Sequence, residues 1–289
     1  MSAHVLFDAP GPRARRRMVV VNVLAALVVV AIAAVALVVL DRKGQLDARL
    51  WTPFLEARTW TGYLLPGLLD TLRAAALAIV ASGVFGLVFG LGRLASSRVV
   101  RVVAGGVVEF FRAVPVLLMM IFFYMGISQL GLLDPGDVPL VAVVLGLTLY
   151  NGSVFAELVR SGVHGLPKGQ REAALVVGLT RGQSLRLVEV PQALIAMLPA
   201  IASQLVVILK DTALGAIITY PELLAAARRL GSGEGNILQA LLVAAIIFIV
   251  INYALTRAAD RLATRVDRRT SGTATAQAPS LAVRAGGDD

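Results

Sequence analysis

The chain has 289 residues, 57% of them hydrophobic, and its mean hydropathy of +0.80 excludes an ordinary soluble domain. Its net charge of +9 does not indicate a nucleic-acid partner, because the arginines stand at the ends of apolar runs and form no single patch with interleaved aromatic residues. The absence of cysteine excludes disulfides and thiolate metal sites, and the two isolated histidines, His4 and His164, form no ligand cluster. We therefore expect an all-α, polytopic membrane protein without a metal or a cofactor.

The N-terminal part predicts one membrane helix that precedes the rest. Residues 1–17 carry a basic cluster, and residues 18–40 form an uncharged run long enough to span a bilayer. Because this run exceeds the core of a signal peptide and lacks a clean cleavage site before Asp41, we interpret it as a retained transmembrane helix, with cleavage as the alternative. Residues 41–64 form a mixed polar segment whose aromatic side chains, Trp51, Trp60 and Tyr63, suit the outer headgroup level.

Five further apolar runs predict the spans of a core that covers residues 65–261. In chain order they lie at 68–91, 103–133, 138–156, 192–217 and 236–256. Ser82, Gly86 and Gly90 put small groups on one face of the first run, which favours close helix packing inside this subunit. The prediction is thus about six transmembrane helices, one N-terminal helix followed by a five-helix core.

The segments between the spans carry the polar residues. Residues 157–191 form a long link after the third core run, and residues 222–235 are expected to be a polar outer loop. Lys210 and Asp211 interrupt the fourth core run, so its helix either bends there or faces a polar interior. Residues 262–289 are expected to be a cytoplasmic tail that starts as a helix and ends in disorder.

The distribution of lysine and arginine predicts the orientation in the membrane. If both termini lie inside, the outer pieces hold only a small share of these residues, namely Arg42, Lys43, Arg49, Arg58, Arg228 and Arg229. The positive-inside rule therefore predicts a multi-pass plasma membrane protein with both termini, and the link 157–191, in the cytoplasm.

The link 157–191 predicts two short helices joined by a turn. Pro167 can start a helix that Glu172, Ala173 and Ala174 continue, and Gly178 supplies the left-handed residue at which helices commonly stop. Thr180 and Gln183 have the spacing of a capping box for a second helix, which is expected to close at Pro191.

The spacing within this link resembles the EAA loop of ABC importer permeases. The match consists of Glu172-Ala173-Ala174, Gly178, Val188 and Val190-Pro191, where the two valines replace the family's usual Ile and Leu. The resemblance implies the transmembrane domain of a type I ABC importer, in which such loops form the coupling helices that sit in a groove of the cytoplasmic ATPase. It implies that Glu172, Ala173, Ala174, Gly178 and Pro191 carry the coupling, and the small residues would let a partner approach the backbone.

The resemblance extends over about residues 65–261. This stretch is similar to the glutamate importer permeases of actinobacteria. It implies a bacterial complex of an ABC ATPase dimer, a second permease subunit that is either a paralogue or a copy of this chain, and an extracellular substrate-binding protein. Glutamate is the implied substrate, and glutamine or arginine remains open, because a cation that binds a carboxylate serves any zwitterionic amino acid.

Charged residues at membrane depth are the candidates for a substrate path, because a charge that faces lipid is costly. Beside Arg73 and Glu109 they are Arg112, Glu157, Lys210 and Asp211, of which Arg112 and Lys210 suit a carboxylate. Snorkelling or structural ion pairs are the alternative roles for these residues.

The sequence contains no P-loop pattern and no nucleophile with a paired base, so the ATPase is expected to be another protein. An ion-coupled secondary transporter and a structural membrane scaffold are the alternative classes, and no matching pair of broken helices supports the first of these.

Overall fold

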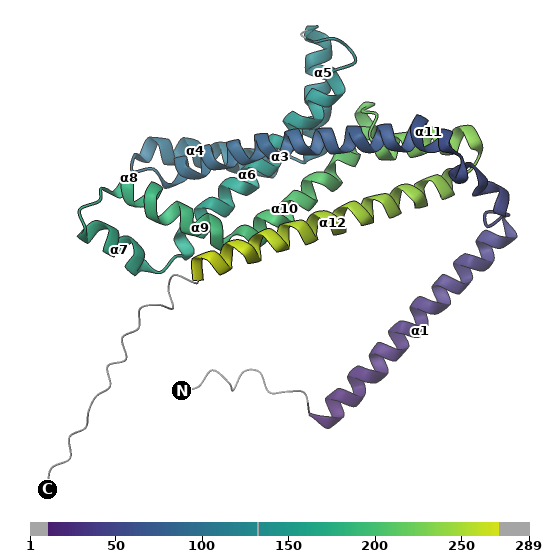
Figure 1. The fold of residues 1–289 in the computed structure, drawn as a ribbon, viewed down its shortest axis with the longest axis horizontal. Coiled ribbons are helices and arrows are strands. Elements are labelled where there is room, and N and C mark those ends of the chain that lie inside the picture. The colour runs from purple at the N-terminus through teal and green to yellow at the C-terminus, as the bar shows by residue number, and fades with distance from the viewer. Residues whose placement is uncertain (1–10, 132, 272–289) are drawn as a thin grey trace.

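The computed structural model describes residues 11–131 and 133–271, and every regular element in these two ranges is a helix. Figure 1 shows four long helices that run alongside one another as a bundle. They are α3 (Leu65–Leu94), α6 (Val138–Gly165), α10 (Leu198–Asp211) and α12 (Ile237–Ser271). The first helix, α1 (Pro12–Arg42), lies apart from this bundle, and its apolar stretch is unburied within the chain.

Shorter elements connect the long helices. Between α1 and α3 lie single turns at Ala48–Leu50, Thr52–Leu55 and Ala57–Thr59, the last of which is α2, followed by a π turn at Trp60–Leu64. The helices α4 (Arg98–Ala113) and α5 (Val116–Leu130) link α3 to α6. At one end of the bundle lie α7 (Lys168–Val176), α8 (Arg181–Ser184) and α9 (Val190–Ala196), and at the other end lies α11 (Leu223–Glu234).

Within the residues that the structure describes, five helices are long and apolar enough to cross a membrane. They comprise residues Arg13–Arg42, Ala57–Leu94, Val138–Gly165, Leu198–Ile218 and Ile237–Ala259, and α4 with α5 makes a sixth span if this bent pair counts as one. The described part of the chain is therefore an all-α fold of five or six spans.

The expected single span at 103–133 is wrong in shape, because α4 and α5 meet at an angle of 96°. The helix ends at Ala113, and both Val114 and Pro115 have extended backbone, with ψ angles of 127° and 132°. Proline disfavours a helical conformation in the preceding residue, which explains why the break falls at Val114.

Three other boundaries differ from those expected. The helix that begins at residue 138 continues to Gly165 and does not end at residue 156, so Glu157 lies on α6 and not in the link. The run 192–217 is broken twice, at Met197 ahead of Pro199 and after Asp211, where a 3-10 helix (Thr212–Ile218) begins. The expected outer loop at 222–235 is the amphipathic helix α11, which the sequence analysis missed because its charged residues lie on one exposed face.

Small residues let α3 and α6 pack closely, as the spacing of Ser82, Gly86 and Gly90 predicted. All three are buried, and the Ser82 hydroxyl donates a hydrogen bond to the Leu147 carbonyl at 3.4 Å. A Cβ atom added at Gly86 would overlap the Phe155 Cβ atom. The close contact between α3 and α6 therefore depends on the absence of a side chain at Gly86.

Replacement of Gly86 by alanine should lower the thermal unfolding midpoint of the purified protein. The added methyl group meets a Cβ atom and helix backbone that cannot move aside, and overpacking of this kind costs about 1–3 kcal/mol. Gly83→Ala is the matched control, because nothing lies within 4 Å of its added Cβ atom on the same helix. Equal midpoints for the two variants would contradict this account of the α3–α6 contact.

Hydrogen bonds fix the start of α11 against the start of α3. The Tyr220 hydroxyl donates to the Asp70 carbonyl at 2.7 Å, and the Leu223 amide donates to the Thr71 hydroxyl at 3.0 Å. The Glu222 carboxylate is fully buried and caps α11 by accepting from the amides of Leu224 at 2.8 Å and Ala225 at 2.7 Å.

The buried Glu222 should make the stability of the protein depend on pH. Burial raises the pKa of its carboxyl from 4.5 to about 7, although the two backbone bonds and Arg229 act to lower it. Between pH 4.5 and 7 the folded state therefore binds more protons than the unfolded state, so stability falls as pH rises through this window and then levels off.

We expect Glu222→Gln to abolish most of that slope and to be the more stable form above pH 7, by roughly 2–3 kcal/mol. The glutamine carbonyl keeps one of the two capping bonds and removes the buried charge, so the lost second bond offsets part of this gain. Unfolding midpoints measured from pH 4.5 to 8 check this result, with Glu234→Gln, an exposed residue of the same helix, as the control. An unchanged slope in the Glu222 variant would show that this carboxyl is not the group responsible.

Candidate functional site

The link after α6 folds into a helical hairpin, residues 168–189, that projects from one end of the bundle. Its first helix, α7, follows Pro167 and ends before Gly178, which adopts the left-handed conformation with a φ angle of +88°. The amide of Gly178 donates to the Leu175 carbonyl at 3.0 Å, and the amide of Leu179 donates to the Ala174 carbonyl at 3.1 Å. The turn therefore supplies hydrogen-bond donors to carbonyls of the last helical turn. The predicted stop at Gly178 is confirmed.

The second arm of the hairpin begins with the predicted capping box. The Thr180 hydroxyl accepts from the Gln183 amide at 3.3 Å, and the Gln183 side chain accepts from the Thr180 amide at 2.9 Å. The expected end at Pro191 is wrong, because α8, a π turn at Leu185–Glu189 and α9 follow one another without a break. Proline is tolerated here because the π turn directly before α9 interrupts the regular hydrogen-bond pattern of the helix.

A buried carboxylate holds the two arms of the hairpin together. One oxygen of Glu189 accepts from Arg171 Nε at 3.1 Å and Nη2 at 2.9 Å, and the other accepts from the Ser184 hydroxyl at 2.9 Å. The Glu189 side chain is only 4% exposed, whereas that of Arg171 is 41% exposed. The sequence analysis missed this pair, although Glu189 is the sole acidic residue between Thr180 and Pro191 and was the available signal.

The turn of the hairpin exposes a cluster of apolar side chains. Val176 is 86% exposed, Val177 is 76% exposed, and Leu187 on the second arm is 66% exposed. Of the predicted coupling residues, Glu172, Ala173, Gly178 and Pro191 are exposed, whereas Ala174 packs inward with 4% exposure. Apolar side chains gathered at a projecting tip are typical of a docking surface.

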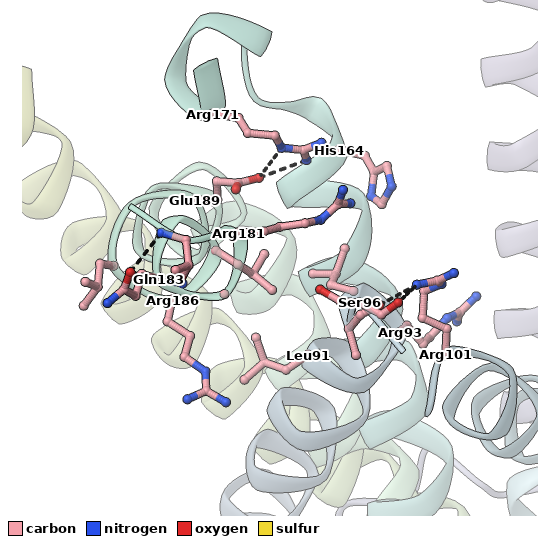
Figure 2. Close-up of a pocket in the computed structure, with 16 residues that line it drawn as sticks. Leu91, Arg93, Ser96, Arg101, His164, Arg171, Arg181, Gln183, Arg186 and Glu189 are labelled. Carbon is pink, nitrogen blue, oxygen red and sulfur yellow. Dashed lines mark hydrogen bonds and ion pairs between the residues drawn. The ribbon is translucent and has the colours of Figure 1, made fainter. Parts of the chain in front are cut away.

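A cationic cavity of about 910 Å³ lies between this hairpin and the junction of α3 with α4. Figure 2 shows the buried Glu189 with its bonds to Arg171, and Arg181 extending toward the side of the cavity where His164 lies. The charged residues of the lining are five arginines and one carboxylate, namely Arg93, Arg101, Arg171, Arg181, Arg186 and Glu189.

The four predicted substrate-path residues fall into two separate groups. Glu157 joins Arg112 at 3.5 Å, and it also pairs with Arg93 at 2.6 Å and Arg160 at 3.0 Å. This network connects α3, α4 and α6 at the end of the bundle that carries the hairpin. Arg112 and Glu157 therefore have the ion-pair contacts of a structural role.

Lys210 and Asp211 form the second group, at the end of α10. Lys210 is exposed and makes no ion pair with any other residue that the structure describes. It lines a groove of about 370 Å³ together with Ala213, Phe248, Ile249 and Asn252. The Asn252 side-chain oxygen is buried without a hydrogen-bond partner in the described part of the chain, and the cation of Lys210 is the charged group that this groove offers.

Comparison with known proteins places the chain among transport components. The family model for the binding-protein-dependent transport system inner membrane component matches residues 82–268. The chain belongs to this family. The matched range begins inside α3 and contains the whole hairpin, whereas α1 lies outside it.

The names of curated relatives of this permease describe amino acid transport. Glutamate transport system permease protein GluD of Corynebacterium glutamicum is 46% identical over 223 residues, which cover 77% of the permease and 82% of GluD. Glutamate/aspartate import permease protein GltK of Escherichia coli is 30% identical over 214 residues, or 72% of the permease and 94% of GltK.

A solved structure agrees with the fold of the permease. The crystal structure of an amino acid ABC transporter with histidines aligns with a TM-score of 0.66 and 27% identity, covering 73% of the permease and 98% of the solved chain. The fold is therefore the transmembrane domain of a type I ABC importer, and an ATPase and a binding protein are partners of such permeases in general.

Proposed function

We propose that this permease imports an amino acid, glutamate first of all, using ATP hydrolysed by a separate subunit that docks on the hairpin 168–189. The observation that carries the docking role is the exposed apolar tip, Val176 and Val177, on a hairpin whose two arms Glu189 holds together. A rigid apolar projection fits a groove in a partner with little loss of conformational entropy. Glutamate is supported by the names of the relatives GluD and GltK, and glutamine or arginine is the alternative.

The coupling residues have distinct parts in this proposal. Glu172 and Ala173 face outward and would contact the ATPase, whereas the buried Ala174 lets α7 pack against the rest of the hairpin. Gly178 provides the turn, and Pro191 lies where the hairpin passes into α9, which contacts α6 and α10. Motion of the tip would thus pass through one continuous helical arm into the bundle.

The proposed orientation is supported by the basic residues at the hairpin end of the bundle. Arg93, Arg101, Arg171, Arg181 and Arg186 gather there, and the positive-inside rule places such an end in the cytoplasm. Both termini would then be cytoplasmic in the plasma membrane of a bacterium. The sequence contains no P-loop, so this subunit is proposed to be a permease without ATPase activity of its own.

The substrate path is proposed to run beside Lys210 and Asp211. Support comes from Lys210, a cation in a membrane span whose electrostatic contact is with the adjacent Asp211, and from the neighbouring groove that Lys210 lines. Arg112 and Glu157 are proposed to brace α3, α4 and α6 at the inner end of that path.

Gentle extraction of the tagged permease from its native membrane tests the proposal. We expect an ATP-binding subunit, a second permease subunit and a substrate-binding protein to co-purify, and the ligand of that binding protein should be glutamate. Co-purification would also show whether the second permease is a paralogue or a copy of this chain. A permease that purifies alone, with uptake driven by a sodium or proton gradient, would refute the proposal.

A further inference from the structure

The cavity beside the hairpin carries more positive charge than its own residues can neutralise. Five arginines line it, and Glu189 is the one carboxylate among the lining residues. Both oxygens of Glu189 are engaged, one by Arg171 and the other by the Ser184 hydroxyl. Glu189 is therefore committed to the hairpin and does not balance the remaining arginines.

Three arginines of the lining have no carboxylate partner among the residues that the structure describes. Arg93 is paired with Glu157, whereas Arg101, Arg181 and Arg186 make no ion pair. Arg101 donates to the carbonyls of Ala95 and Ser96, both at 2.7 Å, which fixes its position and leaves its charge in place. The three come from two elements, because Arg101 belongs to α4 and the other two to the second arm of the hairpin.

We infer that the ATPase subunit places acidic side chains in this cavity, as a second contact beside the apolar tip. This inference rests on the proposed docking of the ATPase to the hairpin. The lining also contains Leu187, which is 66% exposed, and a mixture of apolar surface with arginine is typical of protein interfaces. A carboxylate offers arginine two parallel hydrogen bonds, so it is the protein group that fits these side chains best.

This contact would change what the ATPase moves when it closes. The cavity separates the hairpin from the junction of α3 with α4, so an acidic partner between them would contact both elements at once. Movement of the ATPase would then reach α3 and α4 directly, in addition to α9 through the hairpin.

Binding of the ATPase to the permease pair in lipid nanodiscs, measured over a series of NaCl concentrations, tests the inference. The triple variant Arg101→Glu, Arg181→Glu, Arg186→Glu should bind roughly tenfold more weakly and should lose most of the salt dependence. A second triple variant with glutamine should show a smaller effect in the same direction. Arg228→Glu with Arg229→Glu is the control, since these exposed residues lie on α11 at the opposite end.

Two outcomes would overturn the inference. One is an unchanged dissociation constant and salt dependence in a triple variant that retains the unfolding midpoint of the parent protein. The other is an effect that disappears when phosphatidylglycerol is omitted from the nanodiscs, since the cavity would then bind lipid phosphate.

A separate variant distinguishes this failure from failure of the proposed function. Val176→Asp with Val177→Asp removes the apolar tip and leaves the cavity arginines in place. If this variant loses the ATPase while the arginine variants keep it, only the acidic contact is wrong. If the tip variant also binds normally, the docking role of the hairpin is wrong.

Discussion

Replacement of Gly178 by aspartate should leave the permease inserted in the membrane but should strongly reduce ATP-driven uptake. Gly178 has a φ angle of +88°, a conformation that costs a residue with a Cβ atom about 1–2 kcal/mol. Nothing lies within 4 Å of an added Cβ atom, so the strain acts on the turn and not on the packing of the bundle. The tip would shift, and a charge would enter the apolar surface proposed to contact the ATPase.

We expect uptake of labelled glutamate by membrane vesicles to fall about tenfold or more, because a shift of one or two kcal/mol changes the population of the correct turn by such factors. ATP hydrolysis by the complex should continue without driving uptake. Gly169→Asp is the matched control, since it introduces the same side chain into the exposed start of α7, where space is also open. Normal uptake by the Gly178 variant would count against the coupling role.

Loss of the Glu189 carboxylate should weaken the hairpin and lower glutamate uptake. Glu189→Gln keeps the size of a side chain that is 4% exposed but removes the charge that Arg171 contacts through two nitrogens. Arg171 is 41% exposed and partly solvated, so we expect the hairpin to lose roughly 1–3 kcal/mol and not the full cost of a buried unpaired charge. Glutamate uptake should fall about tenfold, while α3, α6 and α12 stay folded.

A double-mutant cycle with Arg171→Gln checks this assignment. If the pair acts as a unit, the double variant should transport no worse than the Glu189 variant alone, because each single change already breaks the contact. Hydrogen exchange should show faster opening of residues 168–189 in both single variants and unchanged protection of α6. Additive losses of uptake would mean that the two side chains act separately.

The fold and the hairpin could be predicted from local signals in the sequence. The apolar runs identified the spans, and the residues at helix ends identified the turn at Gly178 and the cap at Thr180, because caps depend on neighbours only a few residues away. Family resemblance supplied the residues proposed to carry the coupling. These features are fixed by short-range chemistry that a single sequence contains.

The remaining features depend on contacts between distant residues. Arg171 and Glu189 lie 18 positions apart, and Arg93 and Glu157 lie 64 positions apart, so only the packed helices bring each pair together. The break at Val114 and the helix α11 were missed for another reason. An apolar run hid the effect of Pro115, and polar residues on one face of α11 suggested a loop.

Cross-linking from residue 177 tests the docking of the ATPase most directly. The natural chain has no cysteine, so Val177→Cys provides a single attachment point for a photoreactive maleimide at the tip of the hairpin. We predict that illumination of native membranes joins the permease to an ATP-binding subunit, and that Leu55→Cys, which is 88% exposed in the segment between α1 and α3, does not form this product. If residue 177 yields no ATPase product, or if residue 55 yields the same one, the hairpin is not the surface through which ATP hydrolysis drives transport.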